Sequence, residues 1–434
     1  MNQSRLVAPA LKLLVAANLA LFISSAVAQT PAEEDLARKV DQLGDELAKV
    51  KAQLKQMQEE RAAAPAAATA APASSAAASA SSVSPNEPAT ILFSYGEINY
   101  NRPTKHTEDT QVDLRRFVLG LQHRFDEKNK LVTELEVEHA VSSADDPGEV
   151  EIEQAYVEHA LNQTWSARGG LFLIPAGLLN EKHEPTAYYG VERNFVETAI
   201  IPTTWREGGV EIVGNFDNGL TLQTGFATGF DLNKWDATST EGLESPLGSI
   251  HQELALAKGH DISVFGALNW RGIPGLQLGA SVFTGGATQG QATTNSRVTL
   301  WDLHARWTPG RWDLAALYAR GSISNTAELN QPLVGNPTLI PESFDGWYAQ
   351  AAYKLWEHQE YALTPFVRWE QFNTARSYAD LGTGLTPEAA KTERVITVGA
   401  NFQVSPGIVL KADVQRFREN DDANRFDLGL GWSF

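Results

Sequence analysis

Three absences narrow what this 434-residue sequence can encode. It has no cysteine, which excludes a disulfide framework, a thiolate metal site and a cysteine nucleophile. It has no excess of basic residues, because 35 lysines and arginines stand against 53 acidic residues, a net charge of −18 that argues against a nucleic-acid partner. After residue 28 no apolar run approaches the roughly 20 residues that a membrane helix needs. If the chain spans a membrane, it must therefore do so with strands.

The first 28 residues have the pattern of a secretory signal peptide. Arg5 and Lys12 flank the start, residues 13–27 are mainly apolar, and Ala26-Val27-Ala28 has the small-x-small form of a cleavage site. The alternative, an amino-terminal membrane anchor, is disfavoured because the apolar run is short and interrupted by polar residues. We therefore leave residues 1–28 out of the fold.

Residues 29–61 have the heptad pattern of a coiled coil, which we expect to lie in the periplasm. The a positions hold Val40, Leu47 and Leu54, and the d positions hold Leu36, Leu43, Val50 and Met57. Leucine at a with valine at d is not the dimer-favouring arrangement, so the pattern is compatible with a homotrimer. The alternative is a single amphipathic helix lying on a surface. Residues 62–90 are almost entirely Ala, Ser and Pro, which predicts an extended linker.

From residue 91 to 434 the apolar period changes to two, and short turns alternate with longer polar loops, as in a transmembrane barrel. The tight connections are 126–129, 161–164, 217–219, 272–275, 309–311, 357–360 and 405–407. Seven such turns predict an all-β, 16-stranded antiparallel outer-membrane β-barrel. An even strand number places both termini on the short-turn side, the periplasm of a Gram-negative bacterium.

Aromatic residues support this polarity because they gather beside the short turns, where an interfacial girdle would lie in the outer-membrane lipid. They are Phe125, Trp165, Phe216, Trp270, Trp307, Trp312, Trp356, Tyr361, Phe402 and Trp432. The last strand alternates small or polar residues with the apolar residues Phe426, Leu428, Leu430, Trp432 and Phe434. A terminal Phe after such a strand resembles the signal by which bacterial outer-membrane barrels are recognised for assembly.

The same alternation predicts a polar lumen. Leu131, Thr133, Leu135 and Val137 would face lipid and leave Glu134, Glu136 and Glu138 inside; the other inward candidates are Arg306, Arg368 and Lys411. A lumen this polar predicts a water-filled passage. Residues 150–160 do not alternate cleanly, and either a neighbouring subunit covers their outer face or a bulge interrupts the strand.

One long connection, residues 176–206, is unusually rich in charge and aromatic rings. Its candidate functional residues are Lys182, His183, Glu184, Tyr188, Glu192, Arg193, Glu197 and Arg206. Mixed charge in a pore sets a transverse field that selects solutes by charge and shape. The alternative is an ordinary external loop.

Four motifs carry a resemblance to a known family: LRRF (114–117), GLFLIPAGLLNE (170–181), VERNFVE (191–197) and TTWREGGV (203–210). They resemble the phosphate-selective porin O and P family of trimeric 16-stranded channels, and more closely its broad relatives with unassigned solute. The later half of the chain resembles the family only in pattern. The resemblance implies that segment 176–206, the third distal loop, folds into the channel and narrows it.

Charge separates this chain from that family, whose phosphate selectivity is attributed to constriction lysines and a ladder of arginines. Eight basic and nine acidic residues fall in the first ninety positions, which leaves 27 basic and 44 acidic residues in 91–434. We therefore expect a weakly selective or cation-preferring channel rather than a phosphate channel.

No catalytic residue, metal site or cofactor is expected. His139 and His159, which repeat an EHA motif, would lie roughly 20 Å apart across a hairpin, and His183-Glu184-Pro185 lacks a helical HExxH context. The sequence has no GxSxG elbow, so we expect no enzyme.

The expected function is passive diffusion of small hydrophilic solutes and ions through a trimeric porin. One alternative is a phosphate- or organic-anion-selective porin. Another is a structural tether, a plugged barrel that reaches the cell wall through its coiled coil.

Overall fold

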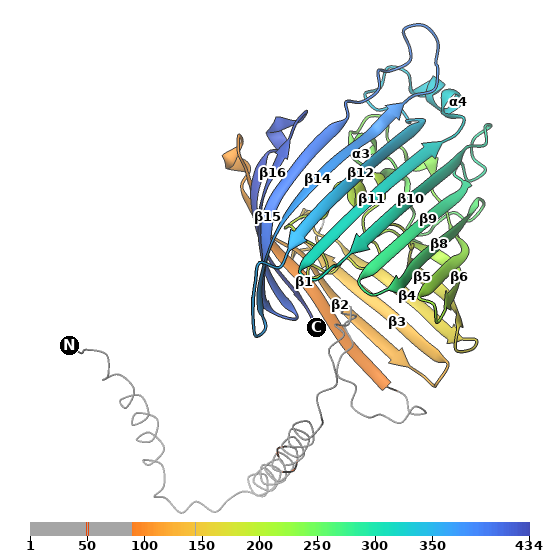
Figure 1. Ribbon diagram of the computed structural model, residues 1–434. Helices are drawn as coiled ribbons and strands as arrows, with labels where there is room; N and C mark the ends of the chain where they lie inside the picture. Colours follow the sequence, from red (N-terminus) through yellow and green to blue (C-terminus); the bar gives the residue numbers. More distant parts are fainter. Residues whose placement is uncertain (1–48, 50, 52–88, 144) are drawn as a thin grey trace, which may run out of the picture. The chain divides into compact units, whose positions relative to one another are not determined.

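In the computed structural model, which describes residues 49, 51, 89–143 and 145–434, one sheet of antiparallel strands closes on itself (Figure 1). The predicted signal peptide 1–28, coiled coil 29–61 and linker 62–90 lie outside the described residues, apart from positions 49, 51, 89 and 90. Among the described residues no helix is long and apolar enough to cross a membrane.

The strands follow one another around the sheet in sequence order. They are β1 (Ala89–Pro103), β2 (Gln111–Arg124), β3 (Asn129–Glu138), β4 (Val150–Ala160), β5 (Trp165–Leu173), β6 (Arg206–Asn215), β7 (Leu220–Thr228), β8 (Ile262–Ile273), β9 (Leu276–Gly286), β10 (Arg297–Trp307), β11 (Trp312–Ile323), β12 (Ser343–Tyr353), β13 (Trp356–His358), β14 (Tyr361–Ser377), β15 (Glu393–Ser405), β16 (Ile408–Phe417) and β17 (Arg425–Ser433).

The last strand closes the barrel onto the first. β17 pairs with β1 from Ser433 opposite Tyr95 to Arg425 opposite Pro103, and Phe434 exchanges two backbone hydrogen bonds with Ser94. β12 and β13 both pair with β14 and form a single barrel strand that is interrupted for two residues. The barrel therefore has sixteen strands, which confirms the predicted fold.

All seven predicted tight connections join neighbouring strands at the end of the barrel that also holds the carboxy-terminus (Figure 1). In the first, the Asp126 carboxylate accepts hydrogen bonds from the backbone N–H groups of Lys128 and Asn129, both at 2.8 Å, so an Asp side chain closes the turn. The sixth turn is shorter than predicted because Glu357 and His358 continue the ladder in β13.

The longer connections at the other end carry the short helices. These are η1 (Thr107–Asp109), η2 (Val196–Ile200), η3 (Leu232–Lys234), α3 (Glu241–Glu244), η4 (Gly248–Ile250), α4 (Thr326–Asn330), η5 (Gln331–Leu333) and η6 (Asp421–Ala423).

The outer face of the barrel is an apolar belt, as strand alternation predicts. Outward side chains such as Leu303, Val398 and Leu410 stay 44–55% exposed in the single chain. Phe125, Trp307, Trp312 and Trp356, beside the short turns, are nearly half exposed. On β17 Leu428 and Leu430 are exposed whereas Asp427 is fully buried. Such a belt with an aromatic row matches the lipid-facing surface of an outer-membrane barrel.

The interior differs from the expected polar lumen, because its long-loop half is apolar on one side. There the inward residues of β8–β12 pack against residues 196–205 and 229–250, and we call this cluster the inner core. Trp205 lies 4.6 Å from Phe283 and 5.3 Å from Phe230, between ring centroids. The change runs along each strand: in β10 the buried inward residues pass from Val298 and Leu300 to Asp302 and His304.

Candidate functional site

The segment from residue 174 to 205, which joins β5 to β6 and which we call the crossing loop, lies inside the barrel. Its residues hydrogen-bond to side chains on β1, β2, β7, β10, β11, β12, β14, β15, β16 and β17. In a closed barrel, a segment that touches strands on all sides must cross the lumen. The loop therefore has the position that the resemblance implied for a constriction loop.

The first attachment involves a buried ion pair on β1 and β2. Arg116 Nε lies 2.9 Å from Glu97 Oε1, and the same guanidinium donates a hydrogen bond to the backbone carbonyl of His183. The hydroxyl of Tyr188 donates to the other oxygen of Glu97 at 2.8 Å. Lys411 Nζ lies 3.5 Å from the centroid of the Tyr188 ring, within cation–π range. One part of the loop is thus fixed by a buried ion pair and a buried lysine.

The second attachment comes from β14 and β16, on the far side of β17 from β1. The guanidinium of Arg368 donates hydrogen bonds to the backbone carbonyls of Tyr189, Glu192 and Arg193, at 3.1, 3.5 and 3.5 Å. Asp413 accepts a 2.7 Å hydrogen bond from the backbone N–H of Val191. Because these strand side chains bond the loop backbone, they set its path independently of its own side chains.

Glu197, in η2, is the centre of the third attachment. Its carboxylate accepts hydrogen bonds from the backbone N–H groups of Leu178 and Leu179 and from Asn194, at 2.6–2.8 Å. It also accepts the hydroxyl of Tyr348 on β12 at 2.9 Å. Burial raises the pKa of Glu197, although these hydrogen bonds act to lower it. The carboxylate therefore ties both ends of the loop to one strand.

The other predicted residues of this segment occupy different places. Glu192 accepts hydrogen bonds from the amides of Asn99 and Asn101 on β1, while Arg193 bonds within the loop. Glu184 is half-buried. Arg206 begins β6 and pairs with Glu151 and Glu253, so it lies at the root of the loop rather than along its crossing.

The predicted lumen residues are inward-facing. Glu134, Glu136, Arg368 and Lys411 are buried, and Glu138 is half-buried. Arg306 forms a bidentate contact with Asp313, at 2.9 and 2.6 Å. His139 contacts Asp113, and His159 contacts Asn129 ten residues away along β3, so these two histidines lie at opposite ends of the strand.

Basic and acidic side chains occupy different parts of the barrel interior. The pKa of Lys182 is lowered by burial and by the neighbouring charges of Arg271 and Arg306, on β8 and β10. Glu134, Glu136 and Glu153 face inward from β3 and β4 on another part of the wall. Basic and acidic side chains thus lie on different parts of the inner face of the barrel.

Sequence reasoning missed Tyr95, Glu97 and Glu153. Tyr95 and Glu97 belong to a period-2 row of buried polar residues on β1, a signal that was present in the sequence. Glu153 was hidden by a β-bulge, since the β3–β4 register shifts between Glu134 and Leu135. The bulge explains why residues 150–160 do not alternate, one of the two interpretations considered.

Comparison with known proteins identifies a matching family model and a related sequence. A family model described as phosphate-selective porin O and P matches residues 278–424. This match covers the wall from β9 to η6, and it includes neither the crossing loop nor the four motifs on which the resemblance was based. An uncharacterised protein of Aquifex aeolicus (strain VF5) is 27% identical over 351 residues, 78% of this chain and 79% of the relative.

Two solved structures share the architecture. OmpF of Salmonella typhi, in complex with daunomycin, superposes with a TM-score of 0.56 at 14% identity, over 81% of this chain and 98% of that one. The outer membrane channel DcaP of Acinetobacter baumannii gives a TM-score of 0.51 at 14% identity, over 80% and 97%. The chain is thus a porin-like outer-membrane barrel.

Proposed function

We propose that this chain forms a trimeric channel through which small hydrophilic solutes and ions diffuse across the outer membrane. The observation that carries the proposal is the crossing loop, which is fastened inside a closed barrel by buried side chains from β1, β2, β12, β14 and β16. A barrel that served only as an anchor would not need a charged loop held at a defined place in its lumen. The matched porin family and the fold favour a channel over an enzyme.

The structure suggests where solutes would pass. The inner core fills the side of the lumen next to β8–β12 at the long-loop end, so the path must run beside it. Near the short turns the inward residues are polar, among them Arg306 and Asp313. The passage is therefore expected to be narrower than a 16-stranded barrel without such a core would allow.

We propose that the channel is weakly selective or prefers cations. The barrel domain carries 44 acidic against 27 basic residues at positions 91–434. Negative charge along a pore raises the local concentration of cations.

An anion channel is the second candidate. Lys182, Arg271 and Arg306 gather on one side, and the family match is to phosphate-selective porins. Reversal potentials under a KCl gradient separate the two: a cation-selective potential supports our proposal, and an anion-selective potential with block by added phosphate supports the second candidate.

Diffusion itself is tested with proteoliposomes and uncharged sugars of increasing size. We expect swelling rates that fall steeply with solute size, because the crossing loop narrows the lumen. Rates equal to those of protein-free liposomes, from protein that retains its barrel on gels, would contradict a channel and favour the tether to the cell wall.

We also propose that residues 29–61 trimerise as a periplasmic coiled coil. The apolar outer residues Val150, Ile152 and Val157 on β4, 46–56% exposed, offer a wall that neighbouring barrels could share.

A further inference from the structure

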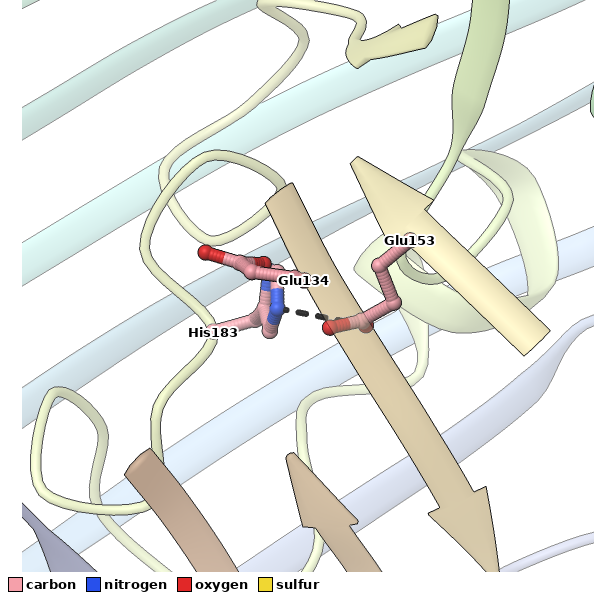
Figure 2. A group of neighbouring side chains, drawn as sticks. All are labelled: Glu134, Glu153 and His183. Carbon is pink, nitrogen blue, oxygen red and sulfur yellow. Dashed lines mark ion pairs between the residues drawn. The ribbon is translucent and has the colours of Figure 1, made fainter. Parts of the chain in front are cut away.

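Three ligand-type side chains from separate elements meet where the crossing loop passes β3 and β4 (Figure 2). Glu134 comes from β3, Glu153 from β4 and His183 from the crossing loop. One donor atom from each lies within 4.8 Å of the other two. His183 Nε2 is 3.5 Å from Glu153 Oε1.

Both carboxylates have an oxygen without a hydrogen-bond partner. These atoms are Glu134 Oε2 and Glu153 Oε1, on residues that are 7% and 0% exposed. A buried carboxylate oxygen that accepts no hydrogen bond is strongly unfavourable, and native proteins usually give such atoms a partner. Glu153 is at the β-bulge, which turns its side chain into the lumen, and bulges often re-aim side chains at functional sites.

The imidazole of His183 is oriented as a metal ligand. Its Nδ1 lies 2.8 Å from the carbonyl oxygen of Asn180, and since a carbonyl can only accept, Nδ1 carries the proton. The nitrogen that faces the carboxylates is therefore Nε2. Asn180 is itself held by hydrogen bonds to the backbone of Ile174 and Trp205. Metal-bound histidines almost always donate the N–H of their second nitrogen to a carboxylate, a backbone carbonyl or water.

Tyr95 is the competing partner in the cluster. Its hydroxyl donates to Glu153 Oε2 at 2.5 Å and lies 2.7 Å from His183 Nε2. These contacts leave Glu153 Oε1 and Glu134 Oε2 without a hydrogen bond, so the tyrosine does not complete the site. Nearby, Glu136 adds a third buried carboxylate, while Arg116 is already paired with Glu97.

We propose that Glu134, Glu153 and His183 bind one divalent transition-metal ion, which clamps the crossing loop to β3 and β4. Two carboxylate oxygens and one imidazole nitrogen suit Zn²⁺ or Co²⁺ better than Mg²⁺ or Ca²⁺, which favour oxygen alone. In a tetrahedral site, bond lengths of about 2.1 Å place the ligand atoms about 3.4 Å apart. The three side chains would therefore move closer together when the ion binds, through changes of the glutamate side-chain torsions. Binding does not depend on whether the barrel conducts.

Titration of the purified, chelator-treated full-length protein with Co²⁺, followed by its visible absorption and by displacement with Zn²⁺, tests the site. We expect one saturable site per chain. Glu153→Gln and His183→Gln should each weaken binding at least 10-fold, because even the loss of an outer-shell partner weakens metal sites 10- to 100-fold. His159→Gln, which removes a histidine near the short turns, should bind like the wild type.

X-ray absorption on the Zn²⁺-loaded wild-type protein provides a readout that needs no variant. One nitrogen ligand of imidazole type with oxygen ligands supports the proposal, and an all-oxygen shell overturns it. Absence of saturable binding, or wild-type affinity in both ligand variants, overturns it as well. Because barrel diffusion is measured separately in proteoliposomes, failure of this site and failure of the channel proposal can be told apart.

Discussion

At the scale of single residues, the crossing loop depends on a few buried charged groups that bond its backbone. Glu197 accepts four hydrogen bonds, two of them from backbone N–H groups. Glu197→Ala would leave these buried donors unpaired, and each such group costs about 1–3 kcal/mol. We predict that this variant keeps its barrel but becomes sensitive to proteases within residues 174–205. Glu184→Ala, in a half-buried position of the same loop, is the matched control; equal cleavage of both variants would contradict the role of Glu197.

Arg368 provides a second prediction at this scale. Its guanidinium donates hydrogen bonds to three backbone carbonyls of the loop, and the single ammonium group of lysine cannot reproduce that geometry. Arg368→Lys should increase current noise or shorten open times in planar bilayers, because the loop loses its hold on β14. Arg320→Lys, at an exposed position on β11, should record like the wild type. Traces of Arg368→Lys that match the wild type would show that the loop is held without this contact.

The position of Lys182 in the lumen predicts that the cation preference of the channel depends on pH. Burial and the charges of Arg271 and Arg306 lower its pKa, so Lys182 loses its positive charge at a lower pH than an ordinary lysine. As pH rises through that lowered pKa, the lumen becomes more negative and cation preference should increase. Lys182→Gln should show the higher cation preference already at neutral pH, with a flatter profile. Parallel pH profiles for the variant and the wild type would remove Lys182 from the conduction path.

At the scale of strands and loops, the sequence predicts what is determined locally. Seven turns and a period-2 pattern suffice for the strand number, because each hairpin is encoded by adjacent residues. The position of Glu153 could not be predicted, since a bulge moves one residue out of the alternation. Nor was the inner core predicted: Val298 and Leu300 share the inward face of β10 with Asp302 and His304, but their apolar partners come from distant loops, which a single sequence does not reveal.

The candidate site was predicted only in part for a related reason. The density of charge in residues 176–206 identifies the loop, and alternation identifies Arg368 and Lys411 as inward-facing. The contacts between them join residues about 180 or more positions apart in sequence, and a single sequence contains no signal for such pairs.

A cross-link tests the position of the crossing loop directly. The hydroxyl oxygens of Thr186 and Ser433 lie 2.8 Å apart, so cysteines at these two positions can approach closely enough for a disulfide. The natural sequence has no cysteine, so no other thiol can compete. We predict that Thr186→Cys/Ser433→Cys forms an intramolecular disulfide under mild oxidation, detected by altered electrophoretic mobility that reductant reverses. Each single variant is a control, and failure of the pair to cross-link would place the loop away from β17.

At the scale of the whole molecule, a porin-like barrel is combined with an amino-terminal segment whose heptads predict trimerisation. Deletion of residues 29–61 is expected to weaken the trimer and leave the conductance of each barrel unchanged, because the crossing loop is fastened within its own chain. Analytical ultracentrifugation in detergent measures the first effect. Loss of envelope integrity in cells with unchanged solute uptake would instead favour the tether.

Single-channel recording of the purified full-length protein in a planar bilayer is the most direct test of the central claim, that the barrel is a channel narrowed by its crossing loop. The account predicts ohmic conductance steps in groups of three with a cation-selective reversal potential, and a noisier current in Arg368→Lys. Absence of conductance from well-folded protein would contradict it, and would mean that the crossing loop and inner core close the barrel.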